Sequence, residues 1–281
     1  MTYTRKSQDI LRVLTLIVIF SLLVSGCKSA NPANAPTAAV AVEASATPAI
    51  VNTPRMVPSP TSMSTPIPLP SSTNTPDSGG GVYAIWQLEK LRVASLKYVA
   101  PSDDAAVNVA LSLKFVRGAD VSNMCGPLAI AILRSGGLVP ATVDLHNFWL
   151  LNPRQADARA LLGRIFPPAE YTDTFFDQPT NEFDFSKFPL KAGDFLYIYA
   201  GDRGSFEHML TVTRVDGAGR AYTVTNLHTD SYHFDIREVA LYDPTQPGVG
   251  QFYEWTRKDN YRLGLTGFGG FEVWRRKVPL P

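Results

Sequence analysis

The chain has 281 residues, and its 26 Lys and Arg nearly balance 25 Asp and Glu, which gives a formal net charge of +1. So small a charge provides no basic surface for nucleic acid and no polybasic segment for lipid head groups. We therefore expect no nucleic-acid partner. The length allows one large or two small domains.

Residues 1–27 have the composition of a signal peptide. Three basic residues precede an apolar run over residues 13–24, and small residues lead to Cys27. The run is too short for a bilayer core, which needs about 20 residues. The ending resembles a bacterial lipobox, which implies that Cys27 is lipidated and becomes the N-terminus of a lipoprotein. An uncleaved anchor is the alternative, and both place the rest outside the cytoplasm, at the cell surface or in the periplasm.

Residues 28–81 form a separate segment rich in Pro, Thr, Ser and Ala. This segment holds ten of the 22 prolines and no aromatic residue. Such a composition cannot build a hydrophobic core and favours extended polyproline conformations. We expect a disordered tether that joins the lipid-anchored end to a single domain over residues 82–281.

The first half of this domain is expected to be helical, with a buried helix at its centre. Gly126 and Pro127 suit a helix entry, apolar residues follow at helical spacing, and Gly137 supplies a left-handed end. Cys125 is expected to cap this helix, at the positive end of the helix dipole, where a lowered pKa favours the thiolate. The other predicted helices cover residues 82–96, 105–113 after an N-cap at Ser102, 142–149 capped by Thr142, and 152–165.

The second half has the pattern of an antiparallel sheet. Its predicted strands, rich in β-branched and aromatic residues, are 194–200, 207–215, 220–227, 232–239 and 271–277. Helices followed by a meander predict an α+β domain in which the Cys125 helix packs on the sheet. Residues 166–190 give no clear pattern, and we consider them a candidate wall of a substrate cleft.

A reactive thiol is favoured by the cysteine count. The chain has two Cys, and if lipid occupies one, Cys125 has no partner for an internal disulfide. An inert buried Cys is the alternative. Four His and no Cys cluster give no zinc pattern, so we expect neither a metal nor a cofactor.

A thiolate nucleophile needs a base, and the base needs a group that orients it. His208 opens a predicted strand, where it can meet the N-terminus of a helix at the sheet edge. His146 lies in a predicted helix, and His228 and His233 lie in looser, more polar sequence. His208 is therefore the candidate base, although a histidine in a strand is often only structural.

A predicted hairpin selects the third residue. Residues 216–220 fit a three-residue loop with Gly219 in the left-handed conformation. In that register His208 lies opposite His228 and diagonal to Asn226, so Asn226 is expected to accept a hydrogen bond from the imidazole. His228 is the alternative third residue, and the alternative role for Asn226 is a strand-end cap. A two-residue loop would instead shift the register by one and turn both candidates to the opposite face.

Two segments carry a resemblance to a known family: residues 123–129 (NMCGPLA) with Gly136-Gly137, and residues 208–217 (HMLTVTRVDG). They are similar to papain-like cysteine peptidases, most of all to the bacteriocin-processing (double-glycine leader) peptidases. The resemblance implies a papain-like α+β fold and a Cys-His-Asn mechanism with Cys125, His208 and Asn226.

The chain differs from that family at two positions. The family usually has Asp where this chain has Asn226, and a Gln that stabilises the oxyanion where this chain has Ala119. The oxyanion would then depend on the Cys125 N–H and on Asn123 as a candidate donor. One such donor is worth about 10²–10³ in rate.

We therefore expect a monomeric, lipid-anchored cysteine peptidase or amidase that cleaves a peptide outside the cytoplasm. One alternative is a hydrolase of cell-wall peptides of the NlpC or CHAP type, because residues 193–196 (GDFL) resemble a feature of those families too. Another is a catalytically inactive papain-like domain that binds a surface partner.

Overall fold

The computed structural model describes residues 82–115, 117–118, 120–230 and 232–280. The predicted signal peptide with Cys27, the tether and the Ala119 position lie outside the described residues. Within the described ranges, no helix has both the length and the apolar character needed to cross a membrane.

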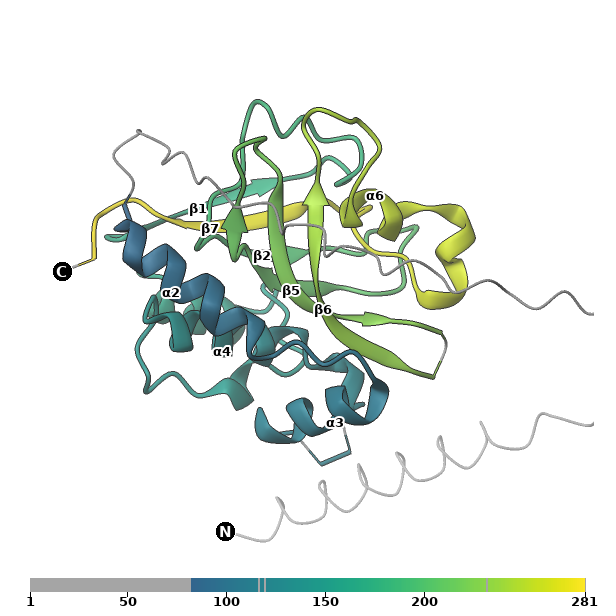
Figure 1. The fold of residues 1–281 in the computed structure, drawn as a ribbon, viewed down its shortest axis with the longest axis horizontal. Helices are drawn as coiled ribbons and strands as arrows, with labels where there is room; N and C mark the ends of the chain where they lie inside the picture. Colours follow the sequence, from purple (N-terminus) through teal and green to yellow (C-terminus); the bar gives the residue numbers. More distant parts are fainter. Residues whose placement is uncertain (1–81, 116, 119, 231, 281) are drawn as a thin grey trace, which may run out of the picture. The chain divides into compact units, whose positions relative to one another are not determined.

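The described domain contains helices and antiparallel strands, which confirms the predicted α+β class. Figure 1 shows α2, α3 and α4 gathered on one side of the strands. The helices are α2 (Ile85–Leu96), α3 (Asp103–Ser112), α4 (Cys125–Gly136), α5 (Ala156–Ile165) and α6 (Gln251–Thr256), with 3₁₀ helices η1 (Val121–Asn123), η2 (Leu145–Phe148) and η3 (Lys258–Leu263). The strands are β1 (Tyr171–Phe176), β2 (Phe195–Ile198), β3 (His208–Thr211), β4 (Arg214–Val215), β5 (Ala221–His228), β6 (Phe234–Tyr242) and β7 (Phe271–Arg276).

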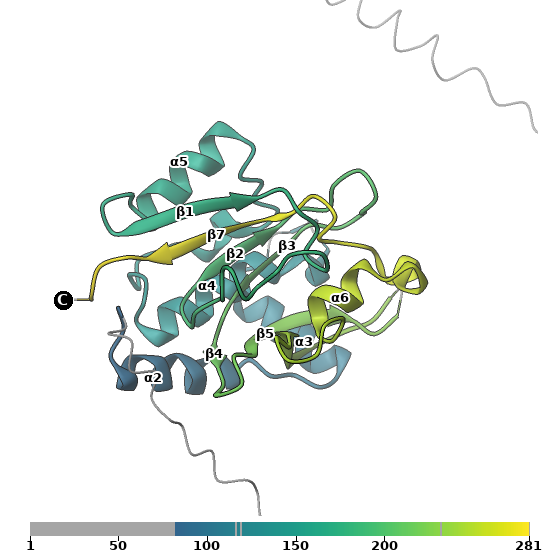
Figure 2. The ribbon, with the colours of Figure 1, turned by 90° about the horizontal axis from the view of Figure 1, so that it is seen from above.

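The strands form two sheets rather than the single meander that the sequence predicts. One sheet has the order β1-β7-β2-β3, visible in Figure 2, and the other has the order β4-β5-β6. The predicted strand 207–215 divides between them: β3 pairs with β2, and β4 pairs with β5. The connection between β3 and β4 is thus the point where the chain passes from one sheet to the other.

Helix α4 is buried along its whole apolar length and has Gly137 as its C-cap, whose φ of 78° is left-handed. Both features were predicted, although Met124 and not Cys125 occupies the N-cap. A Cβ on Gly126 would lie 2.3 Å from the Phe148 carbonyl oxygen and 2.7 Å from Cε of Met209. Glycine at position 126 therefore allows the start of α4 to approach both η2 and β3 closely.

Strand β2 is buried on both faces because the sheet has a hydrophobic core on each side. Phe195 and Tyr197 pack with α4, whereas Leu196 and Ile198 pack in a second core. Phe185 belongs to that second core and stacks on Tyr242 with ring centroids 4.2 Å apart.

Three predictions about the connecting segments need correction. Residues 166–190 contain β1, which pairs with β7, and four of their Phe side chains pack in the second core rather than along a cleft: Phe176, Phe183, Phe185 and Phe188. The expected helix over 142–149 is the short η2, with Asp144 and not Thr142 as its N-cap. Helix α5 begins at Ala156 rather than near residue 152, because the Asn152 side chain accepts from the Arg154 N–H and holds a turn there.

Candidate active site

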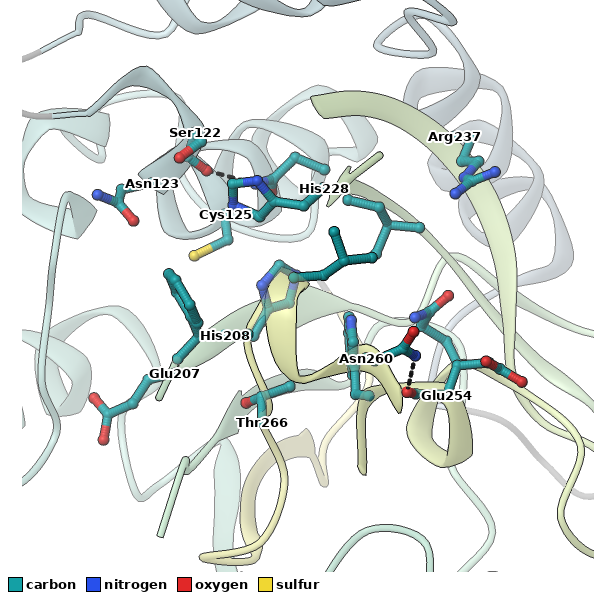
Figure 3. A pocket seen from close by; sticks show the side chains of 17 residues that line it. Ser122, Asn123, Cys125, Glu207, His208, His228, Arg237, Glu254, Asn260 and Thr266 are labelled. Carbon is teal, nitrogen blue, oxygen red and sulfur yellow. Dashed lines mark hydrogen bonds between the residues drawn. The ribbon is translucent and has the colours of Figure 1, made fainter. Parts of the chain in front are cut away.

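A cavity of about 250 Å³ lies at the N-terminus of α4. Figure 3 shows Asn123, Cys125 and His208 gathered toward one end of it, with Arg237 and Glu254 toward the other. The complete lining is Ser122, Asn123, Cys125, Phe206, Glu207, His208, Asn226, Leu227, His228, Arg237, Gln251, Glu254, Trp255, Asn260, Leu263, Gly264 and Thr266. The fold thus brings every catalytic residue that the sequence predicts, and the oxyanion candidate, to one cavity.

Cys125 is the first residue of α4 and is 9% exposed. The first backbone hydrogen bond of the helix joins the Leu128 N–H to the Met124 oxygen at 2.9 Å. The backbone N–H groups before Leu128 have no acceptor within the helix, and Pro127 has no N–H. The backbone N–H groups of Cys125 and Gly126 are therefore available to a negative atom at the thiol.

Burial raises the pKa of Cys125, and the nearby Glu207 carboxylate raises it further. The N–H groups of Met209, Gly126 and Cys125 itself act in the opposite direction but do not outweigh burial. The predicted lowering of this pKa is therefore wrong. The free-energy cost of removing the thiolate from water exceeds the stabilisation that the helix terminus provides. The neutral thiol is therefore the resting form at neutral pH.

His208 opens β3, and its ring is held from two sides. Its Nε2 lies 2.7 Å from Oγ1 of Thr225, and the Trp255 ring lies 4.8 Å away between centroids. Burial, together with a smaller effect of nearby His228, lowers the pKa of His208 to about 3. The imidazole is therefore neutral at rest, so it can take a proton, but it does not form a resting ion pair with the thiolate.

Asn226 lines the cavity but does not bond to His208. Its Nδ2 donates to the Ser122 carbonyl oxygen at 2.6 Å, and its Oδ1 is buried without a partner among the described residues. The side chain thereby ties β5 to the turn that leads into Cys125. The expected Asn226–His208 hydrogen bond is thus absent from the described contacts, and the neighbouring Thr225 takes that place.

A β-bulge explains the difference. The predicted three-residue loop is present: Val215 pairs with Ala221, and Gly219 has a φ of 80°. However, Thr213 also donates its N–H to the Tyr222 oxygen at 2.8 Å, although Tyr222 already pairs with Arg214. Two residues facing one shift the register by one, so the opposite face of β5 turns toward His208.

The other histidines hold different positions. His228 lines the cavity near Phe206, but its strand partner is Phe234 and not His208, so the expected direct pairing is wrong. His233 is exposed, and its Nδ1 lies 2.8 Å from Asp230.

Much of the cavity comes from a segment that the sequence analysis did not assign. Trp255 and Glu254 of α6, and Asn260 of η3, form one wall. The neighbouring Glu207 accepts a hydrogen bond from the Tyr197 hydroxyl and lies 3.6 Å from Arg154. The only signal for Glu207 was its position beside His208. Residues 240–270, which contain α6 and η3, had no predicted element.

Within the described residues, no group of three His, Cys, Asp or Glu side chains could hold a metal ion. No family model, curated protein or solved structure matches the chain. The chemistry of this site is therefore inferred from its residues and their geometry.

Proposed function

We propose that this chain is a papain-like cysteine peptidase or amidase that is anchored by lipid outside the cytoplasm. The observation that carries the enzymatic part is the shared cavity of Cys125 and His208, which come from the start of a buried helix and the start of a strand. The lipid anchor rests on residues 1–27 alone, through the lipobox at Cys27.

Because both groups are neutral at rest, the proposed route is general-base catalysis. His208 takes the thiol proton while the Cys125 sulfur forms a bond to the substrate carbonyl carbon, so no resting thiolate is needed. The oxyanion accepts from the Cys125 N–H and from the candidate donor Asn123. His208 then gives its proton to the amine as the C–N bond breaks.

Hydrolysis of the resulting thioester regenerates the enzyme. His208 takes a proton from water as the water oxygen bonds to the carbonyl carbon, and the S–C bond then breaks. The sulfur recovers its proton from His208, so both groups return to their neutral forms. No cofactor enters this cycle, and each proton has an acceptor within the site.

A second candidate is an inactive papain-like domain that binds a surface partner. The observation that favours it is the pair of pKa shifts at the site, since burial raises the pKa of Cys125 and lowers that of His208 to about 3. Both shifts disfavour the charged forms that activate a thiol, and Ala119 stands where the resembling family has its oxyanion Gln.

Incubation with a mixture of peptides, and separately with purified sacculi, tests the proposal. Mass spectrometry of the products should show cleavage by the wild type and none by Cys125→Ala. His233→Ala is the matched histidine control, because His233 is exposed and paired with Asp230, and it should cleave at the wild-type rate. Release from sacculi alone would select the cell-wall hydrolase, and equal cleavage by Cys125→Ala would refute the thiol mechanism.

A further inference from the structure

We infer that Thr225 is the residue that positions His208 for catalysis, in place of the expected Asn226. This inference rests on the proposed function, because it assigns a role within the same site. Thr225 Oγ1 and His208 Nε2 lie 2.7 Å apart, and Thr225 is 1% exposed. A buried hydrogen bond of this length fixes the ring far more firmly than one that competes with water.

The Thr225 hydroxyl is itself held in place. Thr225 lies in the middle of β5 and pairs with Arg237 of β6, so its backbone is fixed by the sheet. A β-branched side chain has few χ1 rotamers, so Oγ1 has little freedom to leave Nε2. On another side, the Trp255 ring limits tilting of the imidazole. The hydroxyl and the indole together restrain the orientation of His208.

The hydroxyl can either donate to Nε2 or accept from it, and the proposed mechanism requires that it accept. When Oγ1 accepts the Nε2 hydrogen, Nδ1 carries the lone pair and becomes the nitrogen that can take the Cys125 proton. A threonine hydroxyl is neutral, whereas the carboxylate of many such sites is charged. Thr225 therefore orients the base without stabilising the imidazolium, which fits a site where both reacting groups are neutral at rest.

The chain offers a matched control for a test of this role. Thr223 lies on the same face of β5, is fully buried, and donates its hydroxyl to the Thr211 oxygen at 2.8 Å. Thr223→Val and Thr225→Val thus remove the same atom from the same strand at equal burial. Only the second removes a contact with His208, and Thr225→Ser restores the hydroxyl.

The experiment compares these three variants by peptide turnover and by ¹⁵N NMR of the His208 ring. We expect Thr225→Val to lose the wild-type tautomer and at least about tenfold in turnover, as part of the 10²–10⁴ that a placed base supplies. Thr225→Ser should keep the wild-type tautomer and most of the turnover, and Thr223→Val should keep both. A Thr225→Val protein with the wild-type tautomer and turnover would overturn the inference.

The two readouts separate this inference from the proposed function. If the wild type cleaves no peptide but Thr225→Val still changes the His208 tautomer, positioning by Thr225 stands and the peptidase proposal fails. If the wild type is active and Thr225→Val matches Thr223→Val in both readouts, the peptidase proposal stands and the role of Thr225 fails.

Discussion

Replacement of Asn226 by alanine tests whether this residue anchors the turn before Cys125. The hydrogen bond from Asn226 Nδ2 to the Ser122 oxygen measures 2.6 Å, and the two residues are 5% and 8% exposed. The Asn226→Ala substitution removes the Nδ2 donor and leaves the buried Ser122 carbonyl oxygen without this hydrogen bond. Such a loss costs about 1–3 kcal/mol of unfolding free energy.

Loss of a second buried polar atom reduces this cost. The Asn226 Oδ1 atom is buried without a partner among the described residues, and alanine removes that unfavourable atom as well. We therefore expect the lower part of the range, about 1–2 kcal/mol. In a domain of about 200 residues, 1 kcal/mol changes the melting temperature by roughly 2–4 °C, so the expected decrease is roughly 2–8 °C.

Thermal unfolding followed by circular dichroism measures this decrease. Thr229→Ala is the control, because Thr229 is exposed just beyond the end of β5 and should change stability by less than about 0.5 kcal/mol. Asn226→Asp adds a pH test. A buried carboxyl is raised in pKa above about 3.9, and only its protonated form can donate to Ser122. Its stabilising contribution is therefore present below pH 4 and lost as the pH rises through the folded-state pKa.

Two results would refute this reasoning. One is an Asn226→Ala protein with the same melting temperature as Thr229→Ala. The other is an Asn226→Asp protein whose loss of stability relative to the wild type does not change with pH. In addition, Asn226→Ala should reduce turnover less than Thr225→Val, since it acts on the turn and not on the base. The reverse order would return Asn226 to the role of orienting residue.

Three further predictions concern the helix, the thiol and the anchor. Gly126→Ala should destabilise the domain by about 1–3 kcal/mol in urea unfolding because its Cβ would meet the Phe148 oxygen, whereas Gly163→Ala, in open space on α5, should stabilise it by up to about 1 kcal/mol; equal effects would contradict the close approach. Alkylation of Cys125 by iodoacetamide should have a pH midpoint above the free-thiol value of about 8.5, since burial raises its pKa, and a lower midpoint would contradict a neutral resting thiol. Cys27→Ser should release the protein from membranes, because acyl chains supply about 0.8 kcal/mol per buried CH₂ and the tether none; retention after a high-salt wash would count against the lipoprotein.

Features set by local chemistry were predictable from the sequence. The end of α4 at Gly137 and the N-cap at Ser102 are found as expected, because both depend on neighbouring residues. The loop ending at Gly219 also has its predicted conformation. In each case a single residue type satisfies a backbone requirement within one turn.

Features set by distant contacts were not predictable in this way. Strand β3 leaves the predicted hairpin and pairs with β2. The bulge at Thr213 contains no glycine that would have predicted it from the sequence. That one-residue shift exchanges Asn226 for Thr225 beside His208. The pKa of Cys125 follows the same principle, since burial is a property of the whole packed site rather than of the helix terminus.

Covalent trapping by a peptide that carries an electrophile in place of its scissile bond tests the central proposal most directly. Intact-mass analysis should show one adduct, mapped to Cys125, that forms at least about tenfold more slowly in His208→Ala, because the base contributes about 10²–10⁴ to attack by the thiol. His233→Ala should react like the wild type. A wild-type protein that forms no adduct, or one whose rate does not depend on His208, would contradict the proposal that these two residues form a catalytic pair.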